Sequence, residues 1–549
     1  MTDAMRGSRM RQRLTLAVAG AVALTALAAC TSSSSEPGSD DGAGGDSSAR
    51  TVEPGQAESD QEVEQLTVGI PGQILTLDPA ENIASGQYVN GLGMETLLRI
   101  DQDGNLQPWL ATDWEAVSDT VYEYTLREGV KFWDGTELTS EDVKYAWDIH
   151  REGGQPFFSS IESIETPDPS TVVVNLSAPN AAWQYTPGLF YSFIYQKAFH
   201  EQDPESFGQP GRLVMGTGPW QIDSLNPTTG MELSANPNYW GGEPPIKRIS
   251  VKSFADENAM ALALRADEID VAQVIAQPKN FDAAAGGDVT TTASTCAIAL
   301  MGMPTQTAPF DDVHVRRAVA HAINREDIVA AKQGGAGDPL TTLIPPTVLA
   351  SLGDEDEVQA ALDGLPTYEH DLEKAREELA KSKVPDGFEF EFLTTSMYSR
   401  VAQVIAAQLA EIDIVLDVNS VGDTEFTTRL IGEADQRPMT YSETGACTPD
   451  PSWNDLWLGS APEGGPSTLN FANFTPPRID ELQDEGLATI DPSERLDIYT
   501  EILDIVGTEV PYVPLYAEGN TYASQDYELR DFGAFWSNTP WALNLVPKA

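Results

Sequence analysis

The sequence has few basic residues. Its 549 residues include 32 Lys and Arg against 85 Asp and Glu, and the formal net charge is −53 at pH 7. Nucleic acids and anionic lipid surfaces are bound largely through Lys and Arg, so this balance argues against both as partners. A solvated acidic surface keeps a secreted protein soluble, and it says little about the ligand.

Signatures of catalysis and of metal binding are also missing. No G-x-S-x-G, P-loop or H-E-x-x-H motif occurs, and no Cys/His group has metal-site spacing. His314 and His321 are close enough in sequence to share a helix face, but two side chains alone do not define a metal site. The sequence therefore predicts that the protein is not an enzyme and that it holds no metal and no cofactor.

The apolar run near the N-terminus is short for a membrane span. It covers residues 14–29, about 16 residues where a spanning helix needs about 20, and it follows four arginines. The run ends in Leu27-Ala28-Ala29-Cys30, which matches the cleavage box of bacterial lipoproteins. We therefore expect residues 1–29 to be a signal peptide and Cys30 to carry a lipid anchor. The alternative is an ordinary secretory signal followed by an incidental cysteine.

Residues 30–65 have almost nothing to bury. This stretch is rich in Ser, Gly, Pro and acidic residues, the composition of a disordered tether. About 35 flexible residues have an average span of about 30–35 Å, which would hold a folded body near a membrane while letting it turn.

Residues 106–150 predict a strand, a turn and a capped helix. In residues 122–127, Tyr and Leu alternate with polar residues, as in a half-buried strand. Asp134-Gly135 is a turn signal, and Thr139 with Asp142 forms a variant of the capping box. The residues that would then share one helical face are Val143, Ala146, Trp147 and His150.

The same stretch resembles a known family. It contains the strings PWLATDWE (108–115) and LREGVKFWDGTELTSEDVKYAWD (126–148), and it is followed by GTGPW (216–220), the helix-forming run 309–325 and PYVPLY (511–516). Together these strings are similar to the extracellular solute-binding proteins of peptide-type ABC importers, family 5, which includes oligopeptide-, dipeptide- and nickel-binding members. The motifs occur in the family's order across essentially the whole chain after the tether.

The resemblance implies the fold. We expect an α/β, two-lobed periplasmic-binding-protein-like fold (class II, "Venus flytrap") with an accessory subdomain in the first lobe. The alternation of strand and helix patterns in residues 371–418 independently suggests α/β lobes. The expected boundaries are residues 66–96, 213–295 and 517–549 for lobe I, 97–212 for the accessory subdomain and 296–516 for lobe II.

The resemblance also implies ligand-binding residues. In peptide-binding relatives, a carboxylate in a loop of lobe II pairs with the peptide ammonium, and the similar loop here is residues 441–453. Alignment on Pro451 leaves Cys447 near that position, whereas alignment on the cysteines puts Asp450 there. Asp450 is thus a candidate ammonium ligand and equally a candidate loop cap. The other candidate ligand contacts are Ser85, Tyr398, Tyr441 and Trp453.

One departure from the family pattern concerns Ser396. Dipeptide binders have an arginine near this position, where it holds the peptide carboxylate bidentately. The serine argues against a strict dipeptide binder. It is compatible with longer peptides held through their backbone, or with an oligosaccharide stacked on aromatic rings.

The function implied by the resemblance is capture of a solute for import. We expect a lipid-anchored monomer on the outer face of the cytoplasmic membrane that closes on a solute and delivers it to an ABC permease and its ATPase subunits. An oligopeptide is the expected ligand; the alternatives are an oligosaccharide or metal chelate, a surface hydrolase, and a receptor uncoupled from transport. With Cys30 lipidated, Cys296 and Cys447 are an even pair in an oxidising compartment, and relatives carry a comparable bridge, so we expect a disulfide between them.

Overall fold

The computed structural model describes most of the chain after residue 52. The described residues are 53–81, 86–286, 288–292, 297–333, 337–395, 398–430, 432, 437–445, 448–461, 465–467 and 469–548. Five residues singled out in the sequence lie outside these ranges: Cys30, Ser85, Cys296, Ser396 and Cys447. The lipid attachment at Cys30, the ligand contact at Ser85 and the disulfide between Cys296 and Cys447 therefore stay predictions.

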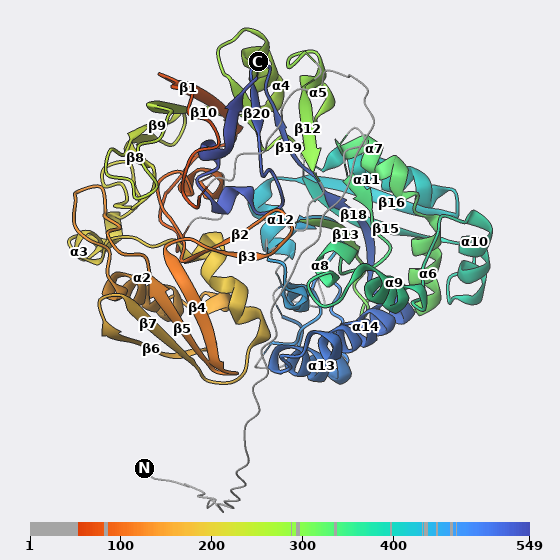
Figure 1. Ribbon diagram of the computed structural model, residues 1–549. Coiled ribbons are helices and arrows are strands. Elements are labelled where there is room, and N and C mark those ends of the chain that lie inside the picture. The colour runs from red at the N-terminus through yellow and green to blue at the C-terminus, as the bar shows by residue number, and fades with distance from the viewer. Residues whose placement is uncertain are drawn as a thin grey trace, which may run out of the picture. The chain divides into compact units, whose positions relative to one another are not determined.

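Lobe I is built on a seven-stranded sheet with the strand order β12-β19-β11-β1-β10-β9-β8 (Figure 1). Its central strand β1 (Leu66–Pro71) pairs in parallel with β10 and β11, and its apolar residues are buried because neighbouring elements cover both faces. The other strands are β8 (Trp220–Asn226), β9 (Gly230–Ala235), β10 (Arg248–Phe254), β11 (Val271–Gln273), β12 (Val289–Thr292) and β19 (Asn520–Ala523). Further elements of the lobe are α1 (Gln87–Asn90), α4 (Glu257–Arg265), α5 (Lys279–Asp282), β20 (Tyr527–Leu529) and β21 (Leu545–Pro547).

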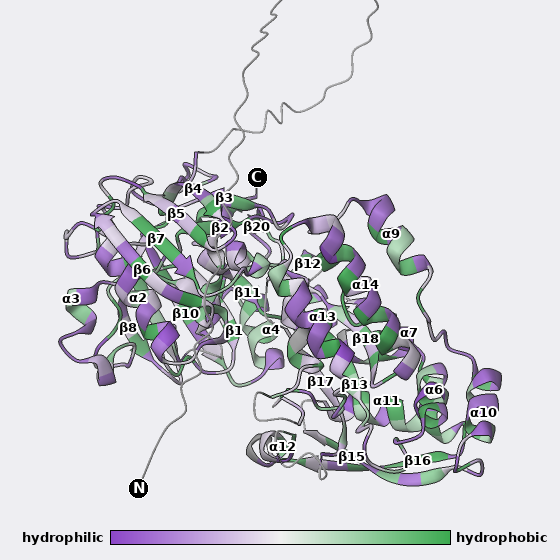
Figure 2. Ribbon diagram, turned by 90° about the horizontal axis from the view of Figure 1, so that it is seen from below, coloured by the Kyte–Doolittle hydropathy of each residue, from purple (hydrophilic) through white to green (hydrophobic). Residues whose placement is uncertain are grey.

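The accessory subdomain is a four-stranded antiparallel sheet, β4-β5-β7-β6, packed on helix α2. Strand β5 (Val121–Leu126) buries alternate residues, and α2 (Ser140–Glu152) begins with a reciprocal Thr139–Asp142 capping box, so both sequence predictions are confirmed. The alternation of apolar and polar residues is visible along these strands in Figure 2. The other elements are β2 (Leu98–Ile100), β3 (Leu106–Pro108), β4 (Ala111–Ser118), β6 (Ile161–Asp168), β7 (Thr171–Leu176), α3 (Lys197–His200) and the 3-10 turns at Pro156–Phe158 and Ala181–Gly188.

The last residues of the segment that the sequence predicts to be a tether lie against lobe I. The Glu58 amide donates to the Leu543 carbonyl at 2.8 Å, and Val63 forms an isolated bridge with Ile246. Gly55 has a φ of +84° and lies against the Trp240 ring, where a Cβ atom would come within 2.4 Å of the ring. Residues 53–65 therefore pack on lobe I as part of the folded body.

Lobe II is built on a second sheet, which in the described residues has six strands in the order β14-β18-β13-β17-β15-β16. Along β13, Ile298 and Leu300 enter one apolar cluster, while Ala299 and Met301 enter another on the opposite face. Helices α6, α7, α10 and α11 cover the Ala299 face, and α8, α9, α12, α13 and α14 cover the other.

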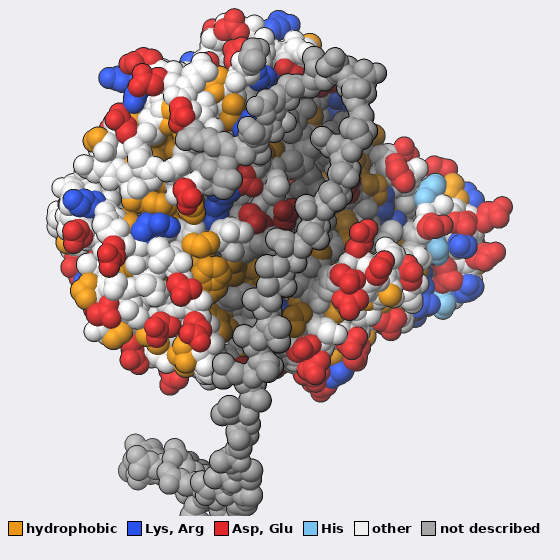
Figure 3. Space-filling view, viewed as in Figure 1, with side chains coloured by type: hydrophobic (Ala, Val, Ile, Leu, Met, Phe, Trp, Pro, Cys, Tyr) orange, Lys and Arg blue, Asp and Glu red, His pale blue; other side chains and the backbone are white. Residues whose placement is uncertain are grey.

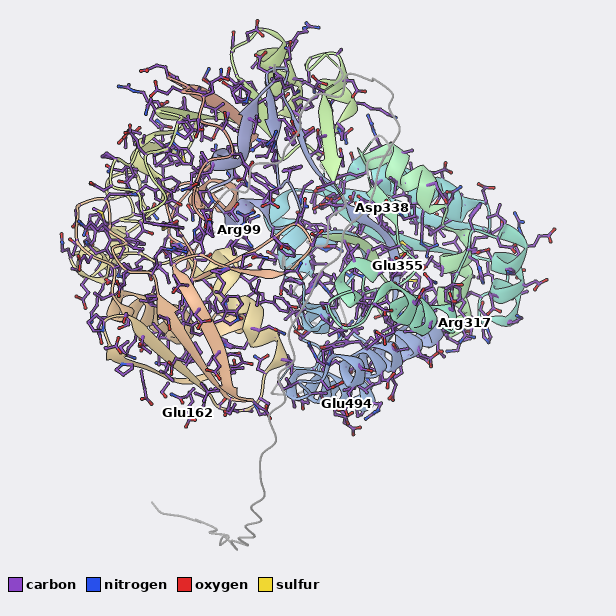
Figure 4. The ribbon with its side chains drawn as sticks, viewed as in Figure 1. Arg99, Glu162, Arg317, Asp338, Glu355 and Glu494 are labelled. Atoms are coloured by element: carbon purple, nitrogen blue, oxygen red, sulfur yellow. The ribbon has the colours of Figure 1, made fainter. Side chains whose placement is uncertain are left out.

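The strands of this lobe are β13 (Ile298–Gly302), β14 (Gly337–Pro339), β15 (Phe388–Thr395), β16 (Ile414–Val421), β17 (Met439–Thr444) and β18 (Tyr512–Glu518). Its helices are α6 (Val313–Ala322), α7 (Arg325–Gln333), α8 (Pro346–Leu349), α9 (Glu355–Asp363), α10 (Leu372–Lys381), α11 (Ser399–Ala410), α12 (Asp423–Leu430), α13 (Pro477–Ala488) and α14 (Pro492–Glu509). Figure 4 labels Glu162 on the accessory subdomain, and Asp338, Glu355 and Glu494 on lobe II.

The chain passes between the two lobes at neighbouring points. It leaves lobe I after β12 and enters lobe II at β13, and it returns from β18 to β19. The strands that flank the two passages are paired antiparallel, β12 with β19 and β13 with β18. Glu518 lies at the return passage, and its amide donates to the Ala297 carbonyl at 2.9 Å. Two adjacent passages of this kind form a hinge.

Candidate ligand-binding site

A group of polar and aromatic side chains gathers beside this hinge, on the Ala299 face of the lobe II sheet. We call it the hinge cluster; its members are Lys332, Tyr398, Tyr441, Glu443, Tyr516 and Glu518. Figure 3 shows a hollow where the two lobes meet, with acidic side chains inside it.

The strand register explains how the cluster assembles. Glu443 of β17 and Tyr516 of β18 are both paired with Ala299 of β13, the strand between them. Register partners point to the same face of a sheet, as do residues two apart on one strand. Tyr441 and Glu518 therefore share the face of Glu443 and Tyr516, and the small side chain of Ala299 leaves room for the larger ones to meet.

Glu443 is the centre of the hydrogen bonding. The Lys332 ammonium lies 2.7 Å from Oε1 and 2.8 Å from Oε2 of Glu443, and both side chains are about nine-tenths buried. The Tyr516 hydroxyl donates to Oε1 at 2.8 Å, and the Tyr441 hydroxyl donates to the same oxygen. A buried carboxylate with one cation and two phenolic donors is well stabilised.

Tyr398 adds an aromatic wall. Its ring centroid is 5.1 Å from that of Tyr441 at an interplanar angle of 71°, and the Lys332 ammonium lies 5.0 Å from the Tyr398 centroid. The first contact is an edge-on aromatic pair and the second a cation–π interaction. The structure thus brings together Tyr398 and Tyr441, two of the residues that the sequence singles out.

Glu518 faces Glu443 from the hinge. The two side chains share one face of the sheet, and Glu443 acts on Glu518 through its negative charge. Burial raises the pKa of Glu518 well above its ordinary value, the charge of Glu443 raises it further, and Lys332 opposes both.

Lobe I approaches the cluster from the other side. Burial raises the pKa of Tyr88 in α1, and the charge of Glu518 adds to this, so Tyr88 is within electrostatic reach of Glu518. The Gln277 amide donates to the Lys332 carbonyl. Burial likewise raises the pKa of Glu257 in α4, and the positive charge of Lys332 opposes the rise. The hinge cluster therefore lies where the lobes meet.

Asp450 lies in a different environment. It is fully buried, and its two carboxylate oxygens accept hydrogen bonds from the Arg495 guanidinium at 2.8 and 2.9 Å. The Ser452 amide donates to Oδ1 at 3.0 Å, which is the contact expected of a loop cap. An ammonium group would reach this carboxylate only by displacing Arg495, so the ligand role of Asp450 stays a prediction.

Trp453 packs in the apolar cluster on the opposite face of the lobe II sheet from Tyr441. It is 3 % exposed, and its ring centroid is 6.2 Å from that of Trp457 at 84°. The structure therefore does not bring Trp453 together with Tyr398 and Tyr441. Its proposed ligand contact would require a surface other than the hinge cluster.

A cavity also lies between the accessory subdomain and lobe II. Its volume is about 430 Å³, and its lining includes Gln102 and Tyr185 on one side and Thr347 and Pro449 on the other. Burial and then the charge of Asp450 raise the pKa of Tyr185 to about 12, which places this tyrosine near the buried ion pair. The buried Asp450–Arg495 pair therefore lies within electrostatic reach of this cavity.

The sequence offers a signal for only part of the hinge cluster. Tyr441 and Glu443 are two apart in a segment that the sequence predicts to be a loop; the structure shows that they lie on strand β17 and therefore share a face. Lys332, Tyr516 and Glu518 come from distant segments, and they meet only through the order β17-β13-β18 and the helix above it.

Two lobes, each on a mixed sheet and joined by two adjacent passages with a polar cluster beside them, define a two-lobed solute-binding protein. The family model of the bacterial extracellular solute-binding proteins, family 5 (Middle), matches residues 105–464. The chain belongs to this family, whose members supply solutes to ABC importers. In the described part of the chain, each helix is too short or too polar to span a membrane.

Individual relatives agree with this assignment. The glutathione-binding protein GsiB of Escherichia coli is 26 % identical over 480 residues, which cover 82 % of this chain and 89 % of GsiB. The ABC transporter-associated protein DppA of Helicobacter pylori, solved with the peptide STSA, has a TM-score of 0.72 at 22 % identity and covers 89 % of this chain and 99 % of its own. NikA of Brucella suis, solved with Fe(III)-EDTA, has a TM-score of 0.74 at 22 % identity and covers 88 % and 100 %. The two structures share the fold, so the expected α/β two-lobed architecture is confirmed.

Proposed function

We propose that the protein is the lipid-anchored binding component of an ABC importer and that it captures oligopeptides by closing its lobes at the hinge. The observation that carries this proposal is the hinge cluster, a buried polar and aromatic surface beside the two passages. Closure would remove a ligand from water at the point where the lobes meet. Groups already held in place lower the ordering cost of binding a flexible solute.

The choice of a peptide rests on relatives and on the sequence. GsiB is a glutathione-binding protein, and DppA was solved with a peptide. The backbone of a peptide offers regularly spaced donors and acceptors to the polar groups on both lobes. The proposal of a lipid anchor is based on the sequence Leu27-Ala28-Ala29-Cys30. Such an anchor would raise the effective concentration of the protein at its permease.

The test is native mass spectrometry of the full-length protein extracted from its own host. A ladder of bound masses that fragment as peptides is the expected result. A hexose-spaced series or a single chelate mass would overturn the peptide assignment and leave the import role in place. Consumption of the retained ligand by the purified protein would instead favour a hydrolase.

A further inference from the structure

The charges within the hinge cluster do not balance. Both oxygens of Glu443 are close to Lys332, which leaves Glu518 facing another carboxyl group. Lys332 is a cation that acts on Glu518, and its ammonium already pairs with Glu443. One lysine against two carboxyl groups leaves a net charge of −1 unless a proton or a further cation is bound.

From lobe I, the described groups that act on Glu518 and Lys332 include a phenol and a carboxylate. Lobe I brings Tyr88 toward Glu518 and Glu257 toward Lys332, which are a phenol and a further carboxylate. The Glu257 carboxylate accepts the amides of Ala276 at 2.7 Å and Gln277 at 3.0 Å, so the backbone of lobe I holds it in place. Among the described residues, the groups that act on Glu518 or on its partners Lys332 and Glu443 include Tyr88 from α1, Glu257 from α4, Tyr398 before α11, Tyr441 from β17 and Tyr516 from β18.

Tyrosine rings line the same space. Tyr398 already holds the Lys332 ammonium over its face, and Tyr441 and Tyr516 direct their hydroxyl groups to Glu443. Aromatic faces and carboxylates together are the groups that bind ammonium and guanidinium ions in proteins. Neither an anionic group nor a purely apolar one would be favoured here, because each would leave the extra carboxyl group uncompensated.

We propose that Glu518, supported by Glu443, is the subsite that receives a cationic group of the ligand, an ammonium or a guanidinium, at the hinge. This inference rests on the proposed function and names the ligand chemistry. The ligand cation supplies a second positive charge beside the two carboxyl groups, in addition to Lys332. The position of Glu518 on the return passage means that the cation also contacts the segment that bends during closure.

The experiment compares three full-length proteins: the native chain, Glu518→Gln, and the control Glu494→Gln, which changes an exposed residue on α14. Ligands retained from the host are identified by mass spectrometry. Each protein is then offered pools of random tetrapeptides, with free or acetylated amino termini and with or without Lys and Arg. Free amino termini and basic side chains are thereby tested as separate sources of the cation.

We expect the native protein and Glu494→Gln to retain ligands that carry at least one cationic group. Glu518→Gln should retain them at least about tenfold less, the usual effect of losing one charged hydrogen bond, with an unchanged thermal midpoint. Retention of acetylated peptides without Lys or Arg at the native level would overturn the subsite but not the peptide function. Retention of cationic non-peptides alone would overturn the peptide function but not the subsite. A chain that retains nothing from the host or the pools would overturn both.

Discussion

Glu95 is a single carboxyl group buried in lobe I, and four donors from three segments surround it. They are the Trp109 indole at 2.8 Å, the Thr217 hydroxyl at 2.7 Å, the Trp240 indole at 3.1 Å and the Tyr239 hydroxyl at 3.2 Å. Burial raises the pKa of Glu95 to about 7, although the four hydrogen bonds oppose this rise. One residue thus couples the stability of the lobe to pH.

The sign of this coupling follows from the raised pKa. Between the unfolded value near 4.5 and the folded value of about 7, the folded protein binds more protons, so the free energy of unfolding falls as pH rises. The fall attributable to Glu95 is up to about 3 kcal/mol. Glu95→Gln should remove this part of the pH dependence in urea unfolding between about pH 5 and about pH 8. Glu162→Gln, an exposed change on β6, is the matched control, and an equal slope in Glu95→Gln and the native protein would contradict the assignment.

Asp450 is the second residue with a clear expected effect. Asp450→Asn leaves the buried Arg495 guanidinium without its carboxylate partner, so unfolding should become easier by about 3–5 kcal/mol. Asp497→Asn, an exposed substitution on the same helix as Arg495, should change stability little. If Asp450→Asn keeps its stability but loses bound peptide, the carboxylate is a ligand contact rather than a structural partner of Arg495.

At the scale of elements, the order of the strands determines which side chains meet in the hinge cluster. Ala299 separates Glu443 from Tyr516, and a larger side chain there would push the two apart. Ala299→Leu should destabilise lobe II by about 1–3 kcal/mol through overpacking. It should also weaken ligand retention by more than its effect on stability explains. Leu300→Met, on the opposite face of the same strand, is the control for stability without loss of ligand.

The elements differ in how well they could be predicted from the sequence. The strand at residues 122–126 and the helix capped at Thr139 could be predicted because their patterns are local. The end of the tether is harder to predict from the sequence. Residues 53–65 form a polar segment, and Gly55 and Val63 reach lobe I through isolated contacts. Most of the hinge cluster could not be predicted from the sequence, because Lys332 and Glu518 belong to distant segments that meet only in the folded lobe. Asp450 is a candidate ligand because its loop resembles the family's ammonium-binding loop, and the loop gives no sign of Arg495, the buried partner 45 residues away in sequence.

At the scale of the whole molecule, the family resemblance correctly predicts both the two-lobed fold and the family. The lipid anchor is the prediction that belongs to this scale. Cys30→Ala should move the protein from the membrane fraction to the medium and abolish labelling by a palmitate analogue, because the thiol is the predicted attachment point. Ser33→Ala is the matched control within the same segment. Membrane retention of Cys30→Ala would favour an anchor of another kind.

The docking of residues 53–65 on lobe I has a mechanical consequence. Val63 and Glu58 fasten the start of the folded body to the strands and loops of lobe I, and the C-terminal strand β21 belongs to the same lobe. If the chain is anchored at Cys30, the membrane holds lobe I directly and holds lobe II only through the two passages. Closure then moves lobe II relative to the lobe that carries the tether, while the tether lets both turn together toward the permease.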